Sequence, residues 1–147
     1  MSTLLELLWA ALAACAFAYI FRVRGVDLVF CAAGGALVWL VWILALRASG
    51  SEPLACLLAT IFATFWSELS ARIRKKVTIL FLVSVIMALV PGGGMYWTMR
   101  SILTSDWDRA IELGLGTLLL AGAMAAGAAV GASIIRLIRG VRLRGRL

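Results

Sequence analysis

One apolar segment of the chain is interrupted in a way that could create a binding site for an anion. Residues Val77–Val90 are mostly apolar, Pro91, Gly92, Gly93 and Gly94 follow, and the segment continues over Met95–Leu103. Proline removes a backbone donor, and each glycine costs about 1 kcal/mol relative to alanine within a helix. We therefore expect the helix to break at Pro91 and a second half-helix to begin after the glycines. The free amides of that half-helix would suit a carboxylate or a phosphate group, although a kink that improves packing is the alternative.

Glu68 is a second residue whose position suggests chemistry. It is the one acidic residue expected well inside an apolar span, where a carboxylate is costly and indicates a function. Arg72 follows four residues later on the same helical face, so an ordinary ion pair near the membrane boundary explains Glu68 equally well. Glu68 would lie about 6 Å along its helix from Arg72, whereas the glycines would lie about 21 Å from the inner end of their span. One ligand would reach both sites if a cavity extended inwards or if the broken span were re-entrant.

The composition indicates that membrane helices position these residues. Of the 147 residues, 64% are hydrophobic and 14% are charged, whereas an ordinary soluble domain carries roughly 25% charged residues. The net charge of +7 comes from basic residues at the ends of apolar segments instead of along one continuous face, which argues against nucleic-acid binding. We therefore predict an all-α integral membrane protein that forms a single transmembrane domain over residues 1–147.

The chain contains few of the residues that catalysis or metal binding requires. It contains no histidine and no recognisable arrangement of a nucleophile with a base, so we predict that it is not an enzyme. Cys15, Cys31 and Cys56 lie inside apolar segments without the spacing of zinc ligands, and no metal or cofactor is expected. The six tryptophans are interpreted as interfacial or packing residues; they are Trp9, Trp39, Trp42, Trp66, Trp97 and Trp107.

The apolar segments are long enough for five crossings of about 20 residues each. The spans are expected at about 3–21, 28–46, 54–71, 77–99 and 110–135, followed by a basic cytoplasmic tail over 136–147. Ser51, Glu52 and Pro53 suit the first turn of the third span. Ser105 with Asp108 three residues later forms a capping-box pattern before the fifth.

The basic residues predict the orientation of these spans, because loops rich in lysine and arginine are retained in the cytoplasm. With five crossings, eleven of the fourteen basic residues fall on one side. They are Arg22 and Arg24 after the first span; Arg72, Arg74, Lys75 and Lys76 after the third; and Arg136, Arg139, Arg142, Arg144 and Arg146 after the fifth. The N-terminus is therefore expected outside and the C-terminus inside, with Arg72, Arg74, Lys75 and Lys76 as cytoplasmic charge anchors.

Small residues predict close helix packing. The fifth span carries Ala123, Gly127 and Gly131 at four-residue steps. Beside that row runs a second one, which consists of Ala125, Ala129 and Ser133. In lipid, such rows allow close approach of two backbones, either within one chain or at a seam between subunits. Gly34 and Gly35 predict a similar contact in the second span.

Two stretches of the sequence carry a family resemblance. They are Ser67-Glu68-Leu69-Ser70-Ala71-Arg72 and Leu89-Val90-Pro91-Gly92-Gly93-Gly94-Met95-Tyr96-Trp97-Thr98-Met99. Both resemble the threonine/serine exporter family, and in particular the small subunit of its two-component type. The similarity extends over roughly residues 10–135, and outside these stretches it lies mainly in hydropathy and length. The small subunits of that type are similarly short, have about five spans and act with a larger partner.

The resemblance implies that the chain belongs to a transporter in a bacterial cytoplasmic (inner) membrane that exports threonine, serine or related small carboxylates. The implied partners are the lipid bilayer, a larger membrane subunit of the same family and a small-molecule substrate, with room for a higher oligomer. In this hypothesis the break at Pro91 lets Gly92, Gly93 and Gly94 bind the substrate carboxylate, Tyr96 and Thr98 supply hydroxyls, and Glu68 couples transport to protons or contacts the amino group. The alternative is a structural or assembly subunit whose fifth helix stabilises a partner that holds the whole pathway.

Overall fold

The fold is all-helical over the part of the chain that the structure describes. A computed structural model describes the backbone of residues 3–144 and the side chains of residues 3–138. Its elements are α1 (Thr3–Ile20), α2 (Val26–Ser49), α3 (Glu52–Arg74), α4 (Thr78–Ile86), the 3-10 turn η1 (Met87–Leu89), α5 (Gly92–Leu103) and α6 (Trp107–Arg144). Helices α1, α2, α3 and α6 are each long and apolar enough to cross a membrane, and α4, η1 and α5 together form a further candidate span, bent by 52°. The prediction of an all-α protein with about five spans and a broken fourth is confirmed.

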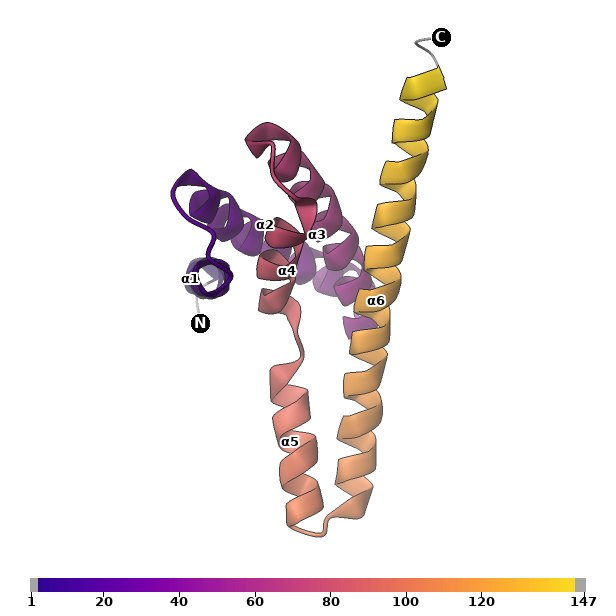
Figure 1. The fold of residues 1–147 in the computed structure, drawn as a ribbon. Coiled ribbons are helices and arrows are strands. Elements are labelled where there is room, and N and C mark those ends of the chain that lie inside the picture. Colours follow the sequence, from indigo (N-terminus) through magenta and orange to yellow (C-terminus); the bar gives the residue numbers. More distant parts are fainter. Residues whose placement is uncertain (1–2, 145–147) are drawn as a thin grey trace.

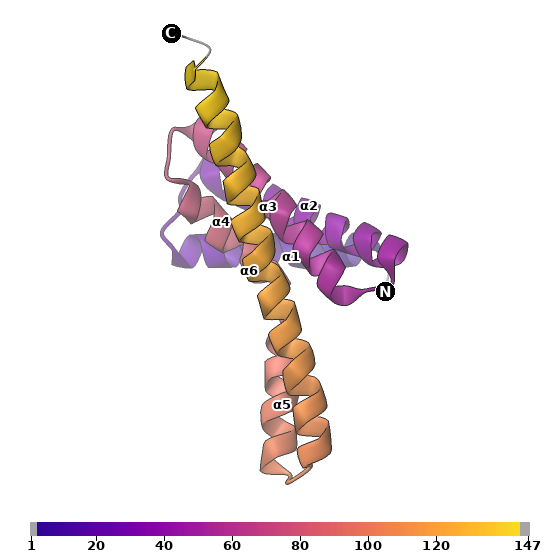
Figure 2. The same ribbon diagram turned by 90° about the vertical axis from the view of Figure 1, so that its right-hand side faces the viewer.

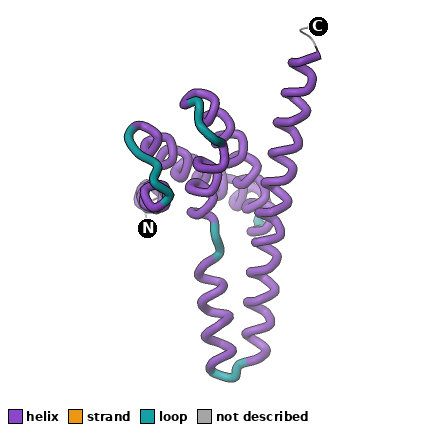
Figure 3. The backbone as a smooth tube through the Cα atoms, viewed as in Figure 1, coloured by secondary structure: helices purple, strands orange, loops and turns teal. Residues whose placement is uncertain are grey.

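The helices form a cluster and a projecting hairpin. Helices α1 to α4 pack together, and α6 runs beside them with α3 as its neighbour (Figure 1). Helix α5 and the first half of α6 form a hairpin that extends away from this cluster, as both Figure 1 and Figure 2 show. Figure 3 shows the loop between η1 and α5 at the point where the hairpin leaves the cluster. The broken span therefore belongs half to the cluster and half to the hairpin.

Several helix boundaries differ from the expected ones. The glycines form the first turn of α5 instead of preceding it, because Gly92 is already helical. Ser105 is not the cap of α6: it has a positive φ of 60°, and the carboxylate of Asp106 accepts the hydrogen bond from the Arg109 amide at 3.3 Å. Helix α6 also continues through Arg144, so the expected tail is helical to that residue, and residues 145–147 lie outside the described part.

Glycines bring α1, α2 and α3 close together, as the sequence predicts for Gly34 and Gly35. A Cβ atom on Gly34 would lie 2.5 Å from Nε1 of Trp66, and one on Gly35 would lie 2.5 Å from Cβ of Ala14. The Trp66 indole lies against Gly34 and donates a hydrogen bond of 3.0 Å to the Phe30 carbonyl. Helix α2 is thus held between α1 and α3 by contacts that any larger side chain would disrupt.

Asp27 forms a buried charge cluster that the sequence analysis did not identify. Its carboxylate, in the first turn of α2, accepts hydrogen bonds from Nε of Arg74 and, at 3.0 Å, from Nζ of Lys76. The side chain of Asp27 is buried, whereas Arg74 and Lys76 remain partly exposed. The cluster ties the start of α2 to the end of α3 and to the turn before α4. Two of the four residues predicted as charge anchors therefore also hold the fold together.

We predict that Asp27→Asn lowers the free energy of unfolding by about 2 kcal/mol. This is less than the roughly 3–5 kcal/mol lost when a fully buried pair is broken, because water can still solvate Arg74 and Lys76. Thermal unfolding of the purified protein in detergent measures the effect, with Asp108→Asn at the exposed start of α6 as the matched control. Equal melting temperatures for the two variants would contradict the role given to Asp27.

Candidate functional site

The backbone hydrogen-bond ladder is interrupted at Pro91, as the sequence predicts. Pro91 has no N–H group, and the Gly92 amide donates to the Val90 carbonyl at 2.7 Å instead of to the Ala88 carbonyl. The ladder resumes where the Met95 amide donates to the Pro91 carbonyl at 3.2 Å. The amides of Gly93 and Gly94 lie in the first turn of α5, where a helix provides no acceptor of its own. The break therefore leaves donors at the start of α5 for an external partner.

The three glycines have different surroundings. Gly92 and Gly93 are exposed, and a Cβ atom on either would meet no other atom within 4 Å. Gly94 instead lies against the side chain of Thr117, which holds α5 next to α6. Hydrocarbon cannot accept hydrogen bonds from exposed amides, so this backbone must face water or another protein surface within a membrane.

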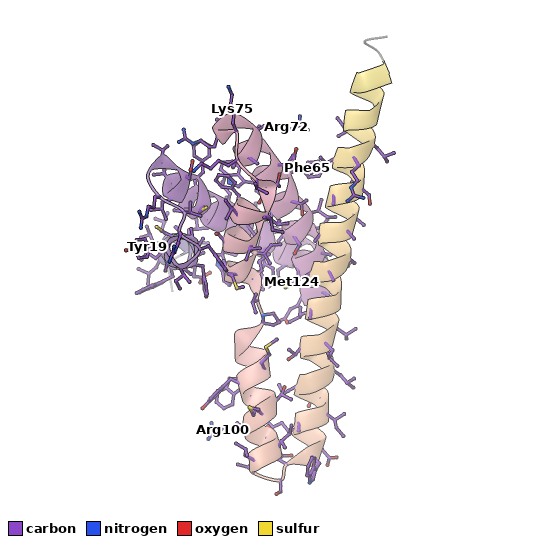
Figure 4. The ribbon with its side chains drawn as sticks, viewed as in Figure 1. Tyr19, Phe65, Arg72, Lys75, Arg100 and Met124 are labelled. Atoms are coloured by element: carbon purple, nitrogen blue, oxygen red, sulfur yellow. The ribbon has the colours of Figure 1, made fainter. Side chains whose placement is uncertain are left out.

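Tyr96 and Thr98, both on α5, have different surroundings. Tyr96 is exposed and contacts Trp97 edge-to-face at 5.4 Å between ring centroids, whereas the half-buried Thr98 donates its hydroxyl hydrogen to the Gly94 carbonyl at 2.7 Å. Arg100 lies over the Trp97 ring, toward the tip of the hairpin (Figure 4). The structure therefore does not bring the two hydroxyls together.

A cavity of about 200 Å³ lies at the break, and we call it the break cavity. Among the residues that line it are Trp39, Trp42, Glu52, Cys56, Ala88 and Pro91. The rings of Trp39 and Trp42 stack with their centroids 4.8 Å apart. A neighbouring cavity of about 360 Å³ shares Trp39 and Ala88 and adds Glu6 and Trp9. From the sequence, Glu52 is expected to be a helix-start residue and the tryptophans are expected to be interfacial or packing residues, so this group is not predicted.

Glu68 lies in a different cavity. One of its carboxylate oxygens accepts a hydrogen bond from Nε of Arg72 at 3.0 Å, and the other accepts one from the Thr78 hydroxyl at 3.0 Å. The cavity there has about 200 Å³ and lies between α3 and α6, where Figure 4 labels Phe65 and Arg72. Glu68 follows Cys56 of the break cavity by twelve residues of α3, or about 18 Å. The structure thus contains the ion pair and separates Glu68 from the glycines.

The two small-residue rows of α6 also differ. A Cβ atom on Gly127 would lie 2.6 Å from the Leu57 carbonyl oxygen, and one on Gly131 would lie 2.9 Å from Cβ of Thr64. Both glycines are buried and Ala123 is half-buried, so this row packs against α3 within the chain. The second row, which consists of Ala125, Ala129 and Ser133, is exposed.

Comparison with known protein families gives a match over most of the chain. Residues 6–134 match the model of a family that is described as "Threonine/Serine exporter, ThrE". Neither the curated proteins nor the solved structures contain a match to this chain.

We predict that Gly127→Leu separates α3 from α6 and lowers the free energy of unfolding by about 1–3 kcal/mol, the usual cost of overpacking. Gly122→Leu is the matched control, because Gly122 lies on the same helix with open space around it. Thermal unfolding in detergent compares the two variants. Equal stability would contradict the assignment of the Gly127 row to packing within the chain.

Proposed function

Because the chain belongs to the threonine/serine exporter family, we propose that it is a subunit that exports threonine, serine or related small carboxylates. The substrate carboxylate binds at the start of α5, and a larger subunit of the same family completes the pathway. Family membership supports a component of a membrane transporter; the substrate, the partner and the site are parts of the proposal.

The observation that carries the proposal is the exposed start of α5. Gly92 and Gly93 leave room for a ligand to approach the backbone, and the amides of the first turn carry the partial positive charge of a helix N-terminus. The break cavity adjoins this turn through Pro91. Discontinuous helices in transporters present such N-termini to anionic substrate groups.

The same exposure supports a partner subunit. Helix α5 packs mainly on α6, and its remaining surface, including Gly93 and Tyr96, is uncovered. Because lipid cannot satisfy the amides there, a second protein surface is the natural cover, with water between the two at the binding site. A larger exporter subunit would supply that surface.

We place the protein in a bacterial cytoplasmic membrane with the N-terminus outside. Arg72 and Lys75 then lie at the cytoplasmic headgroups, together with the partly exposed Arg74 and Lys76. Glu68, held between Arg72 and Thr78, would respond to protons from that side instead of contacting the substrate at the glycines.

A second candidate function is that of an assembly subunit without a substrate site. The exposed row of Ala125, Ala129 and Ser133 favours it, because the row allows another helix to approach α6 closely. The buried row of Gly127 does not discriminate between the two functions, since it is already used within the chain.

The experiment that tests the proposed function is efflux of labelled threonine, serine and succinate from proteoliposomes. The liposomes contain this chain alone, the larger subunit of the same genome alone, or both. We expect efflux of at least one solute to require both chains. No efflux from an intact complex that co-purifies would contradict the exporter proposal.

We predict that Gly93→Leu reduces this efflux at least tenfold at normal protein levels, because the side chain blocks access to the first-turn amides. Gly116→Leu on α6 is the matched control, since that glycine is also exposed with open space around it. Unchanged efflux for Gly93→Leu would contradict the role of the glycines.

We also predict that Ala129→Leu reduces co-purification of the larger subunit severalfold, because it fills the exposed small-residue row. Pull-down from detergent extracts measures the ratio of the two chains, with Leu118→Ala on the same helix as the control for a general change of its surface. If Ala129→Leu abolishes association while Gly93→Leu and Pro91→Ala leave efflux intact, the assembly function is favoured. An unchanged ratio would contradict an interface at this row.

A further inference from the structure

We propose that the break cavity recognises an ammonium group, with Glu52 as the counter-ion and the rings of Trp39 and Trp42 as an aromatic wall. The inference rests on the proposed function, in that the amides at the start of α5 hold the carboxylate of the same small amino acid. It assigns the amino group to a part of the chain that is distant from Glu68.

Small and apolar residues make up most of the lining of the cavity, and Glu52, Trp39 and Trp42 supply its carboxylate and its aromatic faces. Glu52 contributes a carboxylate from the start of α3, and the residue is exposed, which places it where the cavity opens. Ala88 also lines the cavity, and neither Pro91 nor Gly92 donates to its carbonyl in the way that a continuous helix would. An ammonium group has three donors and no acceptor, so it complements this set.

The tryptophans add to the preference for a cation. Trp39 and Trp42 lie three residues apart on α2 and stack at 4.8 Å on the wall of the cavity. Indole is the aromatic ring that attracts cations most strongly, and the attraction grows where water is excluded. A carboxylate beside two indole rings is therefore a favourable environment for a small cationic group.

Trp39 has a polar atom that packing leaves without a partner. Its Nε1 atom is buried and has no hydrogen-bond partner among the described residues. A buried donor without a partner costs about 1–3 kcal/mol, which a ligand oxygen would recover if the Trp39 side chain turned its Nε1 atom into the cavity. A ligand that carries both an ammonium group and a nearby oxygen, as an amino acid does, would satisfy Glu52 and Trp39 together.

The size of the cavity limits the ligand. Its volume of about 200 Å³ is below the range of roughly 300–1,000 Å³ found for drug-sized ligands.

A plain structural role for Glu52, as an acidic residue in the first turn of α3, would account for its charge but not for the indole wall or the unpartnered Nε1.

The test compares L-threonine with 3-hydroxybutyrate, which has the same carbon chain and hydroxyl group but no amino group. Isothermal titration calorimetry measures the binding of each compound to the complex of this chain with the larger subunit. We expect Glu52→Gln to weaken threonine binding about tenfold and to leave 3-hydroxybutyrate binding unchanged. Trp39→Phe, which keeps an aromatic ring but removes the N–H group, should weaken both compounds. Glu112→Gln, at an exposed position on α6, is the matched control.

Three results would overturn the assignment. Glu52→Gln could change neither compound or both equally, Glu6→Gln in the neighbouring cavity could cause the selective loss instead, or the wild-type complex could bind no threonine. A complex that exports succinate but binds no threonine would refute the ammonium site and leave the exporter proposal standing. Conversely, threonine binding that depends on Glu52 in a complex without efflux would support the site and refute the export function.

Discussion

Every backbone amide in a membrane needs a hydrogen-bond partner, and this structure depends on how that constraint is met. In a continuous helix the backbone groups bond to one another. Pro91 and the Gly92 turn interrupt these hydrogen bonds and leave the amides of Gly93 and Gly94 as donors without a helical acceptor. Lipid offers no acceptor, so the interruption persists where water, protein or a ligand takes over. The hairpin of α5 and α6 places this backbone at the edge of the helix cluster, where such a partner can reach it.

The remaining helices act as a frame for the break. Helix α3 is central, because its Trp66 packs on Gly34 of α2 and Gly127 of α6 packs against its other side. The same helix presents Glu52 to the break cavity at its start and Glu68 to a separate cavity near its end. Two polar sites are thus fixed on one rigid element, about 24 Å apart along its axis. A substrate path that used both would need to pass along α3.

Features that depend on local backbone chemistry could be predicted from the sequence. Pro91 fixes the break, long apolar runs fix the spans, and Gly34 with Gly35 fixes a close helix contact. Features that depend on how helices cross could not be predicted. The ion pairs of Asp27, the grouping of Glu52 with Trp39, and the separation of Glu68 from the glycines all require residues far apart in the sequence to be placed in space.

Cysteine accessibility measures whether solute and water reach the broken span. Cys15, Cys31 and Cys56 are replaced by alanine, and Val90→Cys, at the break cavity, is compared with Leu118→Cys on the exposed apolar surface of α6. If solute and water reach the break, a charged, membrane-impermeant thiol reagent will modify Val90→Cys in the assembled complex, threonine will slow the reaction, and Leu118→Cys will not react. A Val90→Cys side chain as unreactive as Leu118→Cys would show that the break is closed to water and solute.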